Sequence, residues 1–315
     1  MRDLIHSFNF IVERELPGNF KGTVGYVGTR AIGQMGFINI NAAAPGTGTS
    51  GRPLFQAFGL TQDINEIEPY GDTTYDSLQA TLNRRWAGSL FGVVYTLSKA
   101  INFADNDANP RIQYLPEKQR NKGLASYNRS HNLQIYGVMD LPFGKNQRWS
   151  GGNSFVNHLI GGWQINTIIS AESGLPITIV QGNGANLNAP GSGQIPDQIV
   201  AQVNMPHGIG VGNPWFDRGA FAVVNIPAGQ PQRFGNVGRN NLIGPAYVNV
   251  DLGVFKTISF SERIRLQLRG EALNALNHAN YGNPQGDINN ANFGYITNTV
   301  GIGERNLRFA ARLSF

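Results

Sequence analysis

Arginines that alternate with apolar residues, within strand-like segments, are the residues of this 315-residue sequence whose type and spacing most strongly suggest a function. In RIRLQLRGEA (263–272) and NLRFAARLSF (306–315), charged or polar residues largely alternate with apolar residues. Such alternation gives a β-strand one charged face, which could steer anionic solutes. The same arginines could instead pair with carboxylates and have a structural role, and both interpretations stay open. The candidate residues are Arg263, Arg265, Arg269, Glu271, Arg308 and Arg312.

Other kinds of chemistry have little support in the sequence. The five histidines lack the spacing of metal ligands or of a catalytic motif, so we expect no enzymatic activity, no metal and no cofactor. DNDAN (105–109) is similar to the start of a calcium loop, but Pro110 occupies the position where an EF-hand needs glycine, which favours an ordinary polar loop. GNGANLNAPGSG (182–193) lacks the Lys-Ser/Thr of a phosphate-binding loop and predicts a flexible surface loop.

Composition narrows the class of protein. Charged residues make up 14% of the chain and glycine occurs 40 times, whereas soluble domains average roughly 25% charged residues and about 7% glycine. The net charge is +5, but the basic residues are dispersed, so we expect no nucleic-acid partner. The absence of cysteine excludes disulfides and thiolate metal sites. The first residues, MRDLIHSFNF, are not typical of a signal peptide.

Period-two alternation indicates the elements that position these residues. We predict an all-β chain of about nine strands, without a comparable helical period. The predicted spans are 6–16, 20–31, 74–86, 89–101, 128–142, 161–172, 246–258, 262–275 and 299–315. Tight turns at 16–20, 86–90 and 259–263 alternate with long segments at 32–73, 102–127, 173–245 and 276–298; the polar turn at 143–160 is of intermediate length.

Long strands joined alternately by short turns and long loops are typical of an antiparallel transmembrane β-barrel in the outer membrane of a Gram-negative cell. In such a barrel the apolar residues would face lipid, and the charged residues named above would face an aqueous lumen. Aromatic residues near strand ends would form interfacial girdles: Trp86, Tyr95, Tyr136, Phe143, Trp163, Phe255 and Phe260. The alternative is a soluble β-sandwich, but sandwich strands are usually shorter and their loops less regular.

Several segments resemble one known family. YDSLQATLNRRWAGSLFGVVYTLSKAI (75–101), NRSHNLQIYGVMDLPFGKNQRW (128–149) and VDLGVFKTISFSERIRLQLRGEALNALNHANYGNP (250–284) are similar to barrel segments of TonB-dependent receptors of the Oar-like type, which carry a carboxypeptidase-regulatory-like domain. The resemblance implies a barrel usually of 22 strands, closed by a plug and energised by the TonB system. It also implies that the barrel-assembly machinery reads the last strand through Phe309, Leu313 and Phe315.

The family's plug, TonB box and signal peptide have no counterpart in these residues. We therefore expect residues 1–315 to be the C-terminal part of a receptor barrel, an incomplete fragment whose partners are outer-membrane lipid, the assembly machinery and, through the missing N-terminal part, TonB. The predicted function is TonB-dependent uptake of an unidentified large substrate. Two alternatives remain: a surface adhesion barrel whose long loops bind partners, and a soluble sugar-binding domain.

Overall fold

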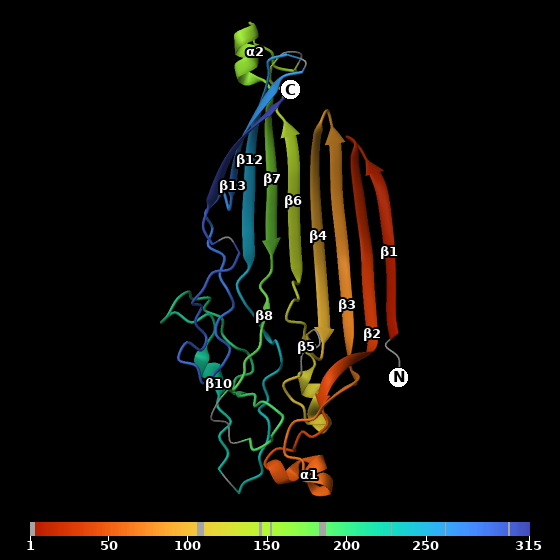
Figure 1. Ribbon diagram of the computed structural model, residues 1–315, viewed down its shortest axis with the longest axis vertical. Helices are drawn as coiled ribbons and strands as arrows, with labels where there is room; N and C mark the ends of the chain where they lie inside the picture. Colours follow the sequence, from red (N-terminus) through yellow and green to blue (C-terminus); the bar gives the residue numbers. More distant parts are fainter. Residues whose placement is uncertain are drawn as a thin grey trace.

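One large antiparallel sheet dominates the fold, as Figure 1 shows. The computed structural model describes residues 4–105, 110–144, 147–151, 153–182, 187–227, 229–261, 263–301 and 303–315. The long strands are β1 (Leu4–Leu16), β2 (Phe20–Asn39), β3 (Asn65–Trp86), β4 (Ser89–Asn102), β6 (His131–Asp140), β7 (Trp163–Glu172), β12 (Tyr247–Ser259), β13 (Arg265–Leu273) and β14 (Asn306–Ser314). They pair in chain order from β1 to β14, so the all-β prediction and its nine strands are confirmed.

The short elements lie between the long strands. Within the described residues the α-helices are α1 (Pro53–Phe58) and α2 (Ser154–Ile160), and 3-10 helices cover Thr49–Gly51, Leu115–Asn121 and Arg218–Ala220. Five two-residue strands complete the described secondary structure: β5 (Gly123–Leu124), β8 (Pro176–Ile177), β9 (Asp197–Gln198), β10 (Phe221–Ala222) and β11 (Leu242–Ile243). No helix in the described part of the chain is long and apolar enough to cross a membrane.

The second hairpin is longer than the alternation predicts. β2 continues to Asn39 and β3 begins at Asn65, so much of the predicted loop at 32–73 is paired strand. The register shifts between Ala31 and Met35, beside Gly33 with its φ of 69°. A β-bulge inserts an unpaired residue into a strand, so beyond it the residues that face one side of the sheet change from even to odd sequence positions, or the reverse. A strict alternation of polar and apolar residues therefore does not predict the outer half of this hairpin.

Register gives the sheet two chemically different faces. One directly paired row crosses seven strands through Val12, Val24, Ala80, Tyr95, Leu133, Ala171 and Val248. The row beside it runs through Glu13, Thr23, Thr81, Val94, Gln134, Ser170 and Asn249. Successive side chains of a strand point to opposite faces, so the first row belongs to an apolar face and the second to a polar face.

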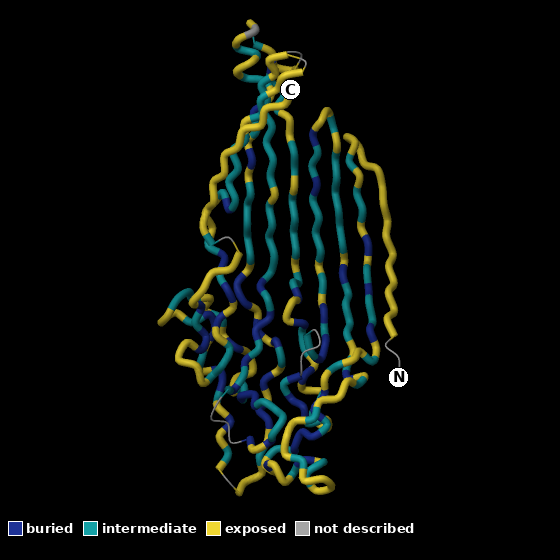
Figure 2. Tube along the Cα trace, in the orientation of Figure 1, coloured by how far each residue is buried: buried dark blue, intermediate teal, exposed yellow. Residues whose placement is uncertain are grey.

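The buried core lies among the long loops rather than against a second large sheet. Figure 2 shows buried residues concentrated beyond one end of the strands, where the segments after β4, β7 and β13 meet. We call this packed region the loop cluster; its buried residues are Ile112, Ile177, Ile179, Leu187, Ala189, Ile195, Val203, Trp215, Phe216, Ala220, Phe221, Phe234, Val237, Leu242, Phe293 and Ile296. Since the described sheets comprise the large one and two pairs of two-residue strands, the β-sandwich alternative is wrong.

Candidate functional site: the polar face and the loop cluster

The polar face brings together most of the charged residues predicted from sequence. Gln267 pairs with Arg312, Arg269 with Ala310 and Glu271 with Arg308, which places these side chains on one face of β13 and β14. Arg265 pairs with Ser314 on the same face. The predicted strand position of Arg263 is wrong, because Arg263 lies in the turn before β13, where Ser261 accepts a hydrogen bond from its backbone N–H. Because Arg263 lies in a turn, the alternation of the strand does not determine the direction of its side chain.

The arginines on this face make few internal contacts. Arg269 donates from Nε to Gln267 Oε1 over 2.8 Å, and its guanidinium lies 5.1 Å from the centre of the Phe255 ring. Among the described residues, no ion pair within 4.0 Å joins Arg265, Arg269, Arg308 or Arg312 to a carboxylate. Their charges therefore remain available to solutes or to another protein segment.

A hollow of about 480 Å³ interrupts the polar face where β4, β6, β7, β12 and β13 run side by side. Its lining includes Leu90, Tyr136, Val138, Ile168 and Phe255, which occupy polar-face positions, with Asn166, Asp251 and Glu271 beside them. The alternation of polar and apolar residues did not predict this site. Its sequence signal is that consecutive strands carry apolar residues at positions where the alternation calls for polar ones.

Glycines make room for the aromatic rings of this hollow. A Cβ on Gly92 would come within 2.7 Å of three atoms of the Tyr136 ring and hydroxyl, and one on Gly253 would lie 3.3 Å from Phe255. Tyr136 donates to Asn83 Oδ1 over 3.0 Å, along the polar face. The prediction that Tyr136 and Phe255 belong to interfacial girdles is therefore wrong, because both lie on the polar face and such girdles form on the outward, apolar face.

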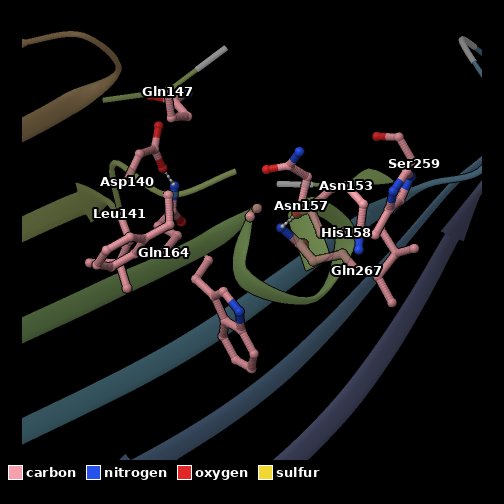
Figure 3. A pocket seen from close by; sticks show the side chains of 15 residues that line it. Asp140, Leu141, Gln147, Asn153, Asn157, His158, Gln164, Ser259 and Gln267 are labelled. Atoms are coloured by element: carbon pink, nitrogen blue, oxygen red, sulfur yellow. Dashed lines mark hydrogen bonds between the residues drawn. The ribbon is translucent and has the colours of Figure 1, made fainter. Parts of the chain in front are cut away.

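A second, polar pocket of about 700 Å³ lies at the short-turn end, below the turn that contains α2. Figure 3 shows Asn153 and Asn157 of that turn facing Gln164 and Gln267 of the sheet, with Gln164 bonded to Asp140 over 2.7 Å. The amide side chains of this lining are suited to hydrogen bonding with a polar ligand or with water. Within the described residues, no group of three His, Asp or Glu side chains could hold a metal ion.

The loop cluster is held together by charged and amide side chains as well as by its apolar core. Arg239 donates to Asp105 Oδ2 over 2.6 Å and to Asn102 Oδ1 over 2.7 Å, which ties the β4 loop to the segment before β12. Burial alone would raise the pKa of Asp105, but hydrogen bonds from Asn102 and Ser126 and the charge of Arg239 hold that pKa below its usual range. Asp105 therefore remains a charged crosslink at neutral pH.

The structure bears on the two loop motifs considered in the sequence, DNDAN (105–109) and the glycine-rich segment 182–193. Asp105 bonds to protein groups, consistent with an ordinary polar loop, whereas Asp107 and Asn109 lie outside the described residues. The described part of the glycine-rich segment, 187–193, is packed rather than a free surface loop, with Leu187 and Ala189 in the core. Apolar residues among glycines supply that packing, which composition alone does not reveal.

The apolar face receives the predicted assembly residues of the last strand. Phe309 pairs with Gly270 and Leu313 with Leu266, so both lie on the apolar face, while Phe315 follows the end of β14 and is 96% exposed. An apolar face that crosses nine strands of 9 to 22 residues, opposite a polar one, is the design of a transmembrane β-barrel wall. These features define the class as a membrane-spanning β-sheet protein.

Comparison with known proteins agrees with this class. Residues 2–308 match the model of the family described as outer membrane beta barrel domain, and the chain belongs to that family, which places it in the outer membrane. A similar solved structure is the outer membrane transporter YddB from Escherichia coli, with a TM-score of 0.49 and 9% identity. The match covers 99% of this chain and 32% of that one, so this chain spans about a third of its length. No curated protein matches the chain.

Proposed function

We propose that the sheet forms part of the barrel wall of an outer-membrane receptor that takes up a large substrate, with energy from the TonB system. The observation that carries the proposal is the two-faced sheet with a packed loop cluster at one end. In outer-membrane barrels the longer loops are extracellular and the short turns periplasmic. The loop cluster would then present a defined surface to the medium, and the polar face, with its hollow, would line the path inward.

The arrangement of charge supports a role for these arginines toward a solute or another protein segment inside the barrel. Arg265, Arg269, Arg308 and Arg312 would project into the lumen without a carboxylate partner among the described residues. Focused positive potential in a water-filled channel raises the local concentration of anionic solutes. Alternatively, these side chains would hold an acidic surface of a plug inside the barrel.

The test compares what cells remove from their medium. Untargeted mass spectrometry of spent medium would be run for the parent strain, for a strain lacking this gene and for a strain lacking TonB. A solute that only the parent strain depletes would identify the substrate and support the proposal. Equal depletion by all three strains would reject TonB-dependent uptake.

Surface adhesion is the second candidate, favoured by the extent of the loop cluster. Its core contains Phe216, Phe221 and Phe293 in edge-to-face contacts, with ring centres 5.2 to 6.1 Å apart. Such packing holds a loop surface in one shape, as partner binding needs. Binding of cells to a surface that depends on this gene but not on TonB would favour adhesion over transport.

A further inference from the structure

We propose that helix α2 is an interfacial anchor that inserts Phe155 and Leu159 into the periplasmic leaflet of the outer membrane. The proposal concerns how the barrel wall sits in the bilayer. It depends on membership of the outer-membrane barrel family and on the orientation of the sheet, and it is independent of transport.

Two residues of the apolar face hold the last turn of α2. Lys256 pairs with Trp163, and both side chains lie on the apolar face at the short-turn end of the sheet. Lys256 Nζ donates to the carbonyl oxygens of His158 over 2.6 Å and of Leu159 over 3.0 Å, and also to that of Gly161. Trp163 Nε1 donates to Leu159 O over 3.0 Å, so the helix end is fixed at the edge of the apolar face.

These contacts explain how a lysine, Lys256, can lie buried on the apolar face. Lys256 is only 8% exposed on a face that meets hydrocarbon, where an unpaired ammonium is strongly unfavourable. The free carbonyls at a helix C-terminus carry partial negative charge, and the Trp163 ring lies 5.1 Å from Nζ. Helix α2 therefore satisfies Lys256, and Lys256 in turn fixes the position of α2.

The two sides of α2 differ in polarity. Asn153 and Asn157 face the polar pocket of Figure 3, where Asn157 bonds to the backbone of Gly151. Positions 155 and 159 are about 200° away on a helix of 3.6 residues per turn, so Phe155 and Leu159 share the opposite side. They are 77% and 63% exposed. Single exposed apolar residues are common, but here two share one side of a helix attached to a lipid-facing surface.

Continuity with the apolar face identifies the occupant as phospholipid. The neighbouring turn between β12 and β13 adds Phe260, which is 64% exposed, and Figure 1 shows α2 beside this turn at the short-turn end. Aromatic and aliphatic side chains on a helix at the membrane surface insert into the headgroup and acyl boundary. The short-turn end of the strands would lie in the periplasmic leaflet.

The absence of cysteine allows a direct test by site-specific labelling. The variants Phe155→Cys and Val211→Cys would each carry the environment-sensitive dye NBD; Val211, 71% exposed in the long segment between β7 and β12, is the matched control. Protein extracted from outer membranes, with any strands that accompany it, would be reconstituted in phosphatidylethanolamine–phosphatidylglycerol vesicles containing lipids with a doxyl quencher at carbon 5 or carbon 12. We expect quenching at position 155, stronger from carbon 5, and none at position 211.

A second variant controls for insertion that the apolar dye itself would cause. With the label at Leu159→Cys, the change Phe155→Ser should lower doxyl quenching by about half, because one of the two inserted side chains is lost. Equal quenching of positions 155 and 211 by aqueous iodide would overturn the proposal. Protection from iodide without doxyl quenching would also overturn it, since a protein partner rather than lipid would then cover α2.

Discussion

At the scale of single residues, the arginines of β13 and β14 can be tested separately from the fold. Arg265 and Arg269 lie on the polar face, with Arg265 exposed and Arg269 bonded only to neutral side chains among the described residues. The double variant Arg265→Ala, Arg269→Ala should therefore change uptake of the identified solute while the amount of assembled protein in the outer membrane stays the same. Uptake assays and immunoblots of outer membranes measure both. A lower assembled amount would instead assign these arginines a structural role.

The carboxyl group of Asp197 makes part of the loop cluster sensitive to pH. Arg233 donates to its two oxygens over 2.9 and 2.7 Å, and this pairing lowers the pKa of Asp197. A carboxyl whose folded pKa lies below its unfolded value of about 3.9 stabilises the fold above that pH, and the contribution disappears as pH falls through the folded pKa. Asp197→Asn should lower the stability of the loop cluster by about 1 kcal/mol at pH 7, with a smaller difference at pH 2.5.

The urea concentration at which half of the loop cluster is unfolded, monitored by limited proteolysis between pH 7 and 2.5, measures this effect. Arg233→Gln is the matched variant, because it removes the same ion pair from the other side. In both variants the loss of stability between pH 7 and pH 2.5 should be smaller than in wild type. A constant difference between Asp197→Asn and wild type across the whole range would contradict the assignment.

At the scale of elements, the last strand combines a membrane-facing surface with a free terminal aromatic residue. Phe309 and Leu313 lie on the apolar face of β14, and Phe315 extends beyond its final pair. If the assembly machinery reads this strand, Phe315→Ala should reduce the assembled protein in the outer membrane several-fold without changing its synthesis. Pulse labelling and membrane fractionation measure both quantities. Val211→Ala, a change at an exposed apolar loop residue, is the control; an equal loss there would indicate general instability.

The sequence predicted the regular strands well because a half-exposed strand records its two faces in every second residue. β4, for example, spans residues 89–102 where 89–101 was expected. The prediction failed where local rules break: the bulge at Gly33 reversed the alternation, and the last strand begins at Asn306 rather than at 299. The hollow and α2 were missed because they depend on register and on contacts between distant segments, such as Lys256 with residue 159.

At the scale of the whole molecule, the two edges of the sheet determine what it can form by itself. Both edge strands, β1 and β14, are exposed along their lengths, and the pairing path ends at each of them. Because nine antiparallel strands alternate in direction, β1 and β14 run the same way, and Figure 1 shows both pointing toward the short-turn end. They cannot close an antiparallel barrel with each other.

Open edges are costly in lipid, where water cannot satisfy backbone groups. Roughly five unpaired N–H and C=O pairs per edge, at several kcal/mol each, amount to tens of kcal/mol, which exceeds the ~5–15 kcal/mol stability of a domain. We therefore propose that further strands pair with β1 and β14 in the membrane, whichever polypeptide supplies them. The 315 residues expressed alone should give no heat-modifiable, protease-resistant monomer in outer-membrane fractions.

Cysteine crosslinking tests the same argument from the edges themselves. Asn9 and Ala310 occupy the middle of β1 and β14 on the polar face, and the cysteine-free chain provides a clean background. In protein assembled in outer membranes, a photoreactive maleimide on Asn9→Cys should crosslink to a strand outside residues 4–315, because an antiparallel partner must run opposite to β1. A disulfide between Asn9→Cys and Ala310→Cys within one chain, or a heat-modifiable monomer of 34.3 kDa, would mean that the nine strands close on themselves after all.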